Sequence, residues 1–305
     1  MNCCIVLATD QNFVRQACVT MASYALSNPL NRCDIFILVH QVDARGLDLL
    51  QTTASAFGLK LGIIPIDLEW TAKLPEAFRA GMTHVSPMTY SKLIAMEYIP
   101  ASYTKCLMID SDLLIVGVID SLLSLELGEV AIGAVADFML PEQSGNRIGL
   151  KNPTSYFNCG VLLVDRANWK KIAPLSSLPV IIEQYSSRIR YGDQDILNLV
   201  FEEAYLSLDY KYNHMLMVAL SGMIPNPRLG EEHPAILHFP GQIKPWHEYA
   251  PRNLQSIYFR YAAACQWIGM RLAEPASIQE TKIAAMLSEK LGNKNLFEKY
   301  VAKLK

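Results

Sequence analysis

The sequence lacks the short motifs that mark several common enzyme classes. No Gly-x-Gly-x-x-Gly follows the first strand-like run at residues 3–8, which disfavours an ordinary dinucleotide dehydrogenase. The seven cysteines include no Cys-x-x-Cys pair, and most of them lie in apolar runs. We therefore expect reduced thiols in the core, which fits a cytosolic protein. The cysteines in apolar runs are Cys3, Cys4, Cys106 and Cys159.

Net charge and long hydrophobic runs are also scarce. The formal net charge is -2, so no general attraction to nucleic acid is expected. Met1 leads almost directly into a short strand pattern and no apolar run is long enough to span a bilayer, so we expect neither a signal peptide nor a transmembrane helix. With 305 residues, 51% hydrophobic and 18% charged, the chain is globular and has room for one large α/β core with appendages, or for two domains.

Strand-like and helical patterns alternate at the start of the chain. Residues 3–8, 34–39 and 61–66 are strand-like, and residues 13–25 and 43–57 have helical spacing. This order predicts a parallel sheet with right-handed crossovers. Ligands of such sheets bind beyond the C-terminal ends of the strands, and Asp10 and Asn12 lie at such an end.

Further elements follow along the chain. Residues 138–155 are polar and punctuated by glycine and proline, so we expect a long loop of the kind that forms lids or binds substrate. Ser86 is a good N-cap and Pro87 suits the first position of a helix at 88–98. The other expected strands are 107–109, 131–136, 156–165 and 235–239, and the other expected helices are 120–125, 166–171, 176–187, 192–203, 253–273, 278–291 and 293–304.

Two aspartates end the apolar run at residues 107–109. An unpaired buried carboxylate is costly, so Asp110 and Asp112 are expected at an exposed strand end or beside a positive group. Residues i and i+2 of an extended segment point the same way, so both carboxylates can face one divalent cation such as Mg²⁺ or Mn²⁺. The alternative is a tight turn between two core strands, with both aspartates solvated.

A second polar cluster opens the helix expected at 192–203. Asp193 is able to cap this helix, which is a sufficient structural reason for that residue. Capping does not explain why Gln194, Asp195 and Asn198 are also polar.

Two lysines stand where they can reach a bound anion. Lys92 follows closely on the start of the helix at 88–98. A turn at Pro240-Gly241 would place Lys244 back over the end of the strand at 235–239. Alone, an exposed lysine is merely a solvated charge.

Taken in order, six segments resemble glycosyltransferase family 8, which includes bacterial lipopolysaccharide galactosyl- and glucosyltransferases and glycogenin. No segment is specific by itself, because Asp-x-Asp occurs widely, but the six stand in the family's order. Their spacing is most similar to the bacterial lipooligosaccharide galactosyltransferase branch. The segments are 8–13, 89–93, 108–112, 156–163, 193–198 and 238–246.

The resemblance implies the nucleotide-sugar transferase A-type fold, a mostly parallel sheet flanked by helices. It implies a catalytic domain at residues 1–250 and a helical extension at 251–305. The implied activity is that of a retaining hexosyltransferase, which moves galactose or glucose from a UDP-sugar to a glycan acceptor with bound Mn²⁺ (or Mg²⁺). A lipid-linked oligosaccharide of the lipopolysaccharide type is the acceptor expected by analogy alone.

The resemblance also implies a role for each matching position. Asp110, Asp112 and His238 would ligate the metal, and two carboxylates with one nitrogen suit Mn²⁺. Asp193 and Gln194 would act as catalytic groups beside the donor sugar. The residues that would bind the donor are Ala8, Asp10 and Asn12 at the uridine, His84 and Val85 in a loop over the donor, Gly241 and Lys244 at the diphosphate, Asp137 and Asn158 at the sugar, and Lys92 and Ser111.

The implied chemistry suits these residue types. Negative charge builds on the leaving diphosphate, and a divalent ion and a lysine oppose it. The oxocarbenium-like centre on the sugar favours nearby polar or negative groups, which Asp193 and Gln194 supply. Gln194 is a poor nucleophile, which favours attack by the acceptor on the leaving-group face, with the diphosphate as base.

Two other functions compete with this interpretation. A phosphatase of the haloacid dehalogenase type uses Asp-x-Asp after a strand, but it expects Gly or Thr next, whereas Leu113 and Leu114 follow here. A nucleotide-sugar-binding protein without catalysis is the second alternative. One departure from the family also matters: arginine usually stands where Lys92 does, and lysine lacks the bidentate fork that binds phosphate.

The last expected helix, at 293–304, carries an apolar stripe opposite three lysines. One interpretation is peripheral contact with the inner face of the cytoplasmic membrane. The other is that the stripe docks on the domain or on a subunit partner. The stripe consists of Leu296, Phe297, Tyr300, Val301 and Leu304, and the lysines are Lys294, Lys299 and Lys303.

Overall fold

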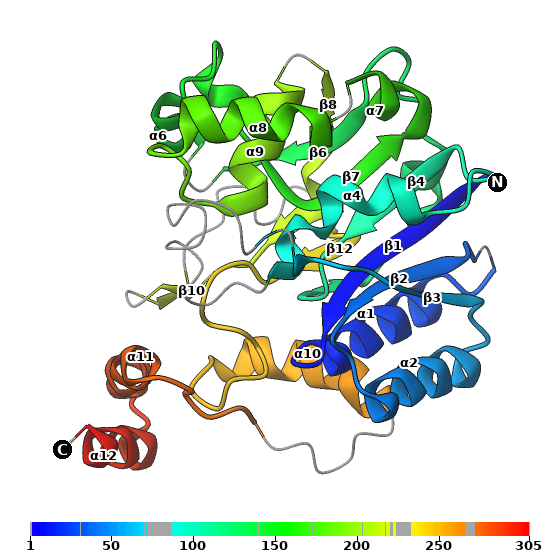
Figure 1. Cartoon of the computed structure of the whole chain (residues 1–305). Helices are drawn as coiled ribbons and strands as arrows, with labels where there is room; N and C mark the ends of the chain where they lie inside the picture. The colour runs from blue at the N-terminus through cyan, green and yellow to red at the C-terminus, as the bar shows by residue number, and fades with distance from the viewer. Residues whose placement is uncertain are drawn as a thin grey trace.

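A seven-stranded sheet forms the centre of the computed structural model, with helices on both faces (Figure 1). The structure describes residues 2–30, 32–69, 71, 87–138, 141–172, 174–202, 204–216, 218–219, 222–223, 233–265 and 272–304. The strand order is β3-β2-β1-β4-β7-β6-β8. The strands are β1 (Cys3–Asp10), β2 (Ile35–His40), β3 (Leu61–Pro65), β4 (Lys105–Ile109), β6 (Ile132–Ala136), β7 (Phe157–Asp165) and β8 (Tyr205–Ser207).

The sheet is mostly parallel, which confirms the expected fold class. β1 pairs in parallel with β2 and β4, β2 with β3, and β6 with β8. Only β7 runs antiparallel to its neighbours, β4 and β6, among the strands that the structure describes. β7 is buried along almost its whole length on both faces, which explains why its sequence is apolar apart from Asn158 and the final Asp165.

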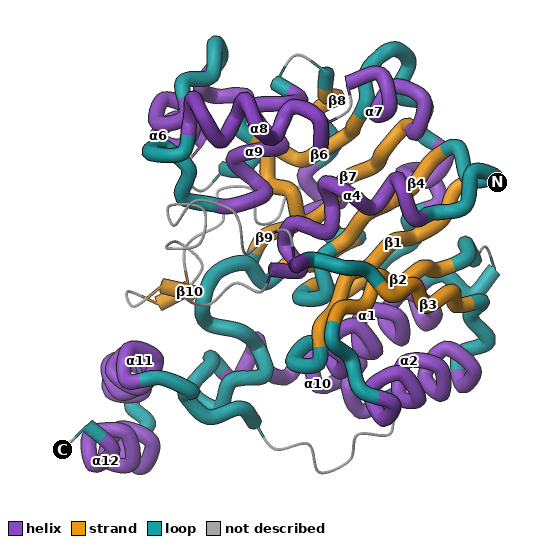
Figure 2. The backbone as a smooth tube through the Cα atoms, viewed as in Figure 1, coloured by secondary structure: helices purple, strands orange, loops and turns teal. Residues whose placement is uncertain are grey.

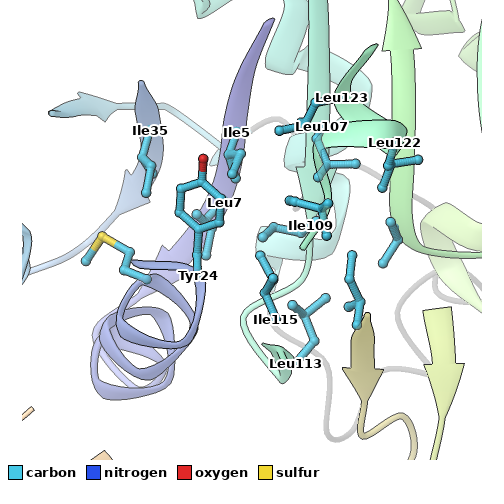
Figure 3. Close-up of a cluster of buried hydrophobic side chains, with 14 of the residues drawn as sticks. Ile5, Leu7, Tyr24, Ile35, Leu107, Ile109, Leu113, Ile115, Leu122 and Leu123 are labelled. Carbon is cyan, nitrogen blue, oxygen red and sulfur yellow. The ribbon is translucent and has the colours of Figure 1, made fainter. Parts of the chain in front are cut away.

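The alternation of side chains along β1 divides the core into two layers. Ile5 and Leu7 face α1 (Val14–Ser27) and α2 (Ala44–Ala56), where Tyr24 of α1 packs beside them (Figure 3). Cys4 and Val6 face the opposite layer. That layer contains α4 (Ser91–Tyr98), α7 (Arg166–Ile172), α8 (Pro174–Tyr185) and α9 (Gly192–Phe201).

A smaller sheet continues the chain beyond β4 and positions the candidate site. Its order is β5-β12-β9, with β5 (Leu113–Ile115) antiparallel to β12 (Ile236–His238) and β9 (His214–Met215) parallel to β12. His238 is paired in register with Leu113. The bend between β4 and β5 therefore carries Asp110 and Asp112 to the residue that ends β12.

The expected long loop at 138–155 is wrong. Within it lie α6 (Pro141–Ile148) and the 3₁₀ helix η3 (Pro153–Ser155). The same residues that suggested a loop serve these helices: Gly149, at φ 81, follows the end of α6, and a Cβ on Gly145 would lie 2.2 Å from the backbone oxygen of Pro153. Glycine is used here for close packing between two short helices.

Two other expected helices differ in extent. The helix expected at 253–273 ends as α10 (Arg252–Ala264), and Ala273 instead pairs with the chain at 246–248, donating its N–H to the Trp246 carbonyl. The helix expected at 88–98 begins as a 3₁₀ turn, η2 (Pro87–Tyr90), before α4. Its expected cap, Ser86, lies outside the described residues.

The remaining elements complete the described chain (Figure 2). They are α5 (Asp120–Ser124), η4 (Tyr210–Asn213), α11 (Ile278–Lys290), α12 (Lys294–Lys303) and the short hairpin of β10 (Val218–Ala219) and β11 (Gly222–Met223). No helix in the described ranges is long and apolar enough to cross a membrane.

The apolar stripe of α12 docks on the chain itself. Tyr300 is fully buried in a cluster that includes Trp246, Tyr249 and Tyr258. Leu296, Phe297 and Val301 pack against the same cluster, whereas Leu304 remains 38% exposed. The docking interpretation of the stripe is therefore the one that the structure supports.

We predict that Gly145→Ala destabilises the protein. Alanine in place of glycine inside a helix ordinarily stabilises by about 1 kcal/mol, but the contact with Pro153 should reverse the sign to a loss of about 2–3 kcal/mol. Urea unfolding measures the difference. The exposed neighbour Asn146→Ala in the same helix is the control and should be neutral or slightly stabilising. A stable Gly145→Ala variant would contradict the close approach of α6 and η3.

Candidate active site

The bend that carries Asp110, Ser111 and Asp112 is fixed to the elements around it. Ser111 donates its hydroxyl to the carbonyl of Ala8 on β1 at 2.9 Å. The Asp110 N–H donates to Gly160 on β7, and the Asp112 carbonyl accepts from Phe239 just after β12. Both aspartates are thus held at the carboxyl end of β4 by hydrogen bonds that depend on the backbone of three strands.

Asp110, Asp112 and His238 converge on one point. One ligand atom from each of them lies within 4.8 Å of the others, a spacing that could hold a metal ion. His238 Nε2 is 3.4 Å from Asp112 Oδ1 and 3.9 Å from Asp110 Oδ2. The three residues expected to ligate a metal therefore lie close enough together to hold one.

A chain of amides determines which nitrogen of His238 faces the aspartates. Asn158 Oδ1 accepts from the Gly160 backbone N–H, so this atom is an oxygen, and it also accepts from Asn213 Nδ2. Asn213 Oδ1 is then the atom 2.9 Å from His238 Nδ1, which must carry the proton. The lone pair of His238 Nε2 therefore faces the two carboxylates, as metal ligation requires.

Gly160 makes room for this arrangement. A Cβ at this position would lie 2.2 Å from Cε1 of His238. A larger residue would push the imidazole away from the aspartates, so the Asn-Cys-Gly segment of β7 has a packing reason to end in glycine.

Each aspartate of the pair also contacts a lysine. Lys92 Nζ lies 2.6 Å from Asp110 Oδ1, and Lys244 Nζ lies 2.5 Å from Asp112 Oδ2. Burial raises the pKa of Asp112, but the charge of Lys244 outweighs it and holds that pKa well below its usual range. The turn at Gly241, with φ 86, returns Lys244 over the strand end as expected.

Lys92 is buried among acidic groups, which the sequence did not predict. Its ammonium is 3.4 Å from Asp193 Oδ2 and 3.5 Å from Cys159 Sγ. Burial lowers the pKa of Lys92, yet Asp110, Cys159 and Asp193 together raise it well above its ordinary value. The lysine is therefore charged, and its charge balances two carboxylates.

The expected helix cap at Asp193 is wrong. Tyr191 is the N-cap of α9, without a side-chain cap hydrogen bond, and the Asp193 carboxylate accepts from Thr89 while it faces Lys92. Burial raises the pKa of Asp193, and the charge of Lys92 opposes that shift. A buried carboxylate is better compensated by a buried cation than by the N–H groups at a helix start.

Gln194, Asp137 and Asn158 form a neighbouring polar group. Gln194 Nε2 donates to Asp137 Oδ2 at 3.2 Å, and Gln194 Oε1 accepts from Asn158 Nδ2 at 3.2 Å and from the Cys159 N–H at 3.3 Å. Asn158 joins this group to His238 through Asn213. The expected sugar-site residues are therefore connected to the expected metal ligands.

The hydrogen bonds of Asp195 and Asn198 explain why these two positions of α9, which capping left unexplained, are polar. It is completely buried and accepts both terminal guanidinium nitrogens of Arg147, the Tyr156 hydroxyl and two backbone N–H groups. Asn198 bonds both the N–H and the carbonyl of Phe157. These contacts attach α9 to β7 and α6, and the sequence pattern gave no signal for Arg147 or Asn213.

The remaining expected residues are placed less completely. Asp10 and Asn12 lie at the end of β1, where Asp10 Oδ1 accepts the Asn12 N–H at 2.9 Å. Within the described part of the chain, neither of these two residues hydrogen-bonds to Asp110 or Asp112. His84 and Val85 lie outside the described residues.

Known proteins resemble this chain in sequence and in fold. "Glycosyltransferase GlyF" of Streptococcus pneumoniae serotype 4 is 29% identical over 84% of this chain, which spans 60% of the length of GlyF. "Lipopolysaccharide 1,2-glucosyltransferase" of Escherichia coli is 27% identical over 82% of this chain and 75% of that protein. A crystal structure of the galactosyltransferase LgtC with donor and acceptor sugar analogs is 25% identical, with a TM-score of 0.73 over 85% of this chain and 95% of that chain.

These likenesses agree with the order of the motifs and with the geometry above. The structural match to LgtC identifies the nucleotide-sugar transferase A-type fold. The model of glycosyl transferase family 8 matches residues 4–250. That span includes every residue of the aspartate, histidine and lysine cluster, and the chain belongs to glycosyl transferase family 8.

Proposed function

We propose that this chain is a metal-dependent, retaining glycosyltransferase that moves galactose or glucose from a UDP-sugar to a glycan acceptor. The single observation that supports it best is the convergence of Asp110, Asp112 and His238 beside Lys244. We propose a lipopolysaccharide or lipooligosaccharide acceptor, because relatives such as the E. coli glucosyltransferase carry that name, and we propose that the chain acts in the cytoplasm. Residues 1–250 would form the catalytic domain and residues 251–305 a helical extension.

Asp110, Asp112 and His238 would hold the metal, and Mn²⁺ suits them. Two carboxylate oxygens and one imidazole nitrogen form a ligand set of borderline hardness, and the lone pair of His238 Nε2 faces the carboxylates. When bound, the ion would oppose the negative charge that develops on the leaving diphosphate.

The two lysines would have different roles at the site of the developing diphosphate charge. Lys244 would bind the diphosphate directly, because its ammonium contacts Asp112 of the candidate metal site and follows a turn that Gly241 allows. Lys92 is buried behind Asp110 and Asp193, so its charge would orient these carboxylates more than it would contact phosphate. This role fits a lysine, which needs less space than the arginine usual in the family.

The polar contacts of Gln194 and Asp195 favour attack on the leaving-group face. Gln194 is an amide whose oxygen already accepts two hydrogen bonds. The charge of Asp195 is neutralised by Arg147 and shielded by the Tyr156 hydroxyl and two N–H groups. Neither is prepared to form a covalent bond to the sugar, so the acceptor hydroxyl would attack directly and a diphosphate oxygen would take its proton.

The two alternative functions fare differently. The phosphatase interpretation loses its basis, because the family match spans the Asp-x-Asp segment and five other motifs. A binding protein without catalysis would share the donor site and differ only in turnover. Release of UDP from UDP-galactose or UDP-glucose in the presence of a glycan acceptor separates it from a transferase.

We predict that UDP and Mn²⁺ together stabilise the protein. With Mn²⁺ saturating and UDP at about a hundred times its dissociation constant, the gain from UDP should be about 2–3 kcal/mol, larger than the gain from the same UDP concentration without the metal. Thermal unfolding with each ligand and with both measures it. Asp110→Asn should lose the joint effect, while Asp48→Asn, an exposed aspartate on α2, should keep it. Failure of the natural protein to respond at millimolar concentrations would rule out this donor.

We predict that Lys92→Met destabilises the protein by about 3–5 kcal/mol, because it leaves two acidic neighbours without their buried cation. Lys60→Met is the matched control. Lys60 also pairs with one aspartate, Asp34, but its side chain is 79% exposed, so the loss should stay under about 1 kcal/mol. Denaturant unfolding at pH 7 compares the two, and equal losses would refute the buried charge balance.

A further inference from the structure

The C-terminal helix α12 contacts the loop that carries Lys244. This loop, residues 239–250, is called the Lys244 loop below. Glu248 of the loop accepts a hydrogen bond from Lys299 Nζ at 2.6 Å and another from the Tyr300 hydroxyl, and both donors belong to α12. Lys299 and Tyr300 lie beyond residue 250, where the family match ends.

The hydrogen bond from the Tyr300 hydroxyl to Glu248 involves a buried side chain. The Tyr300 side chain is fully buried, and its ring packs edge-on against Tyr249 with 6.2 Å between ring centres. Burial raises the pKa of Tyr300, and the hydrogen bond to Glu248 raises it further, so the phenol stays protonated and donates. A carboxylate at Glu248 is the matching acceptor.

Within the Lys244 loop, a hydrogen bond connects Lys244 to the residue that precedes Glu248. Lys244 donates its backbone N–H to Nδ1 of His247 at 3.3 Å. Burial and the charge of Lys244 lower the pKa of His247 to about 4, so the imidazole is neutral at pH 7 and able to accept. Glu248 follows His247 directly, so a shift of Glu248 would also shift the group that holds the backbone of Lys244.

Two other contacts fix the same segment. The His247 carbonyl accepts from Gln255 Nε2 on α10 at 2.8 Å, and the Glu248 N–H donates to Ala273 at 3.0 Å. At the other end, the Lys244 ammonium reaches both Asp112 and the Phe239 carbonyl. The loop is therefore anchored at the candidate metal site on one side and by the C-terminal region on the other.

We propose that Glu248, Lys299 and Tyr300 are positioning residues, through which α12 sets the affinity of the site for the diphosphate of the donor. This inference rests on the proposed function, because it needs Lys244 to bind the diphosphate. Since Lys244 would bind that group both before and during the reaction, a displaced loop should raise the KM for the donor more than it lowers kcat.

The test compares lysines of one helix that differ in a single partner. Lys299 contacts Glu248 and Glu274, whereas Lys303 contacts Glu274. Lys299→Met and Tyr300→Phe should each raise the donor KM and the Kd for UDP with Mn²⁺ by about fivefold, with kcat within about twofold. Lys303→Met should change neither. Hydrogen exchange over residues 240–250 should be faster in the first two variants only.

The outcomes separate the two proposals. If the natural chain does not bind UDP with Mn²⁺, the proposed function fails. If it binds UDP, and Lys299→Met and Tyr300→Phe keep its affinity and loop exchange, the positioning role is overturned. An equal loss in Lys303→Met would assign the effect to the helix as a whole and also overturn it. Glu248→Gln, which still accepts from Tyr300, should lose less affinity than Glu248→Ala, and the reverse order would count against the role.

Discussion

The candidate site depends on one constraint: carboxylates placed at the end of a buried sheet must be neutralised. Asp193 is buried, Asp110 and Asp112 are partly buried, and each of the three contacts a lysine. Removing such charges from water costs several kcal/mol apiece unless a cation and hydrogen bonds compensate. This need explains why Lys92 is buried on α4 and why the loop after β12 turns back at Gly241. A divalent ion bound between Asp110 and Asp112 would also neutralise their negative charge.

Orientation is supplied by a different kind of contact, a line of neutral amides. The Gly160 N–H fixes Asn158, Asn158 fixes Asn213, and Asn213 fixes the tautomer of His238. The line starts on a backbone N–H, which cannot rotate or exchange roles, so each later amide has one satisfied orientation. It also connects the two sheets, because Asn158 belongs to β7 and His238 to β12. The metal ligands and the sugar-site group are thereby positioned as one unit.

The sequence predicted what is encoded locally and missed what depends on distant partners. Continuous apolar runs predicted the strands of the core, and the order of six motifs pointed to Asp110, Asp112, His238 and Lys244, which the structure brings together. Asn213 gave no local signal, because its role exists only when β9 and β12 meet beside β7. Asp193 looked like a cap because capping is a local rule, yet a buried lysine 101 positions earlier overrides it. Glycine and proline at 141–153 do not distinguish a loop from a pair of short helices, because they occur in loops and also allow two helices to pack closely.

The role of the apolar stripe on α12 depends on which surface covers it. Apolar residues at helical spacing predict burial, and they do not tell whether lipid, another subunit or the same chain provides the cover. A polar contact distinguishes these possible partners. Tyr300 lies inside the stripe, and its hydroxyl needs a hydrogen-bond acceptor once the ring is buried. Glu248 supplies that acceptor, and it follows closely on Lys244 in the sequence. A hydrocarbon surface would offer the phenol no such partner. The requirement to satisfy one buried hydroxyl therefore links the C-terminal helix to the loop over the candidate diphosphate site.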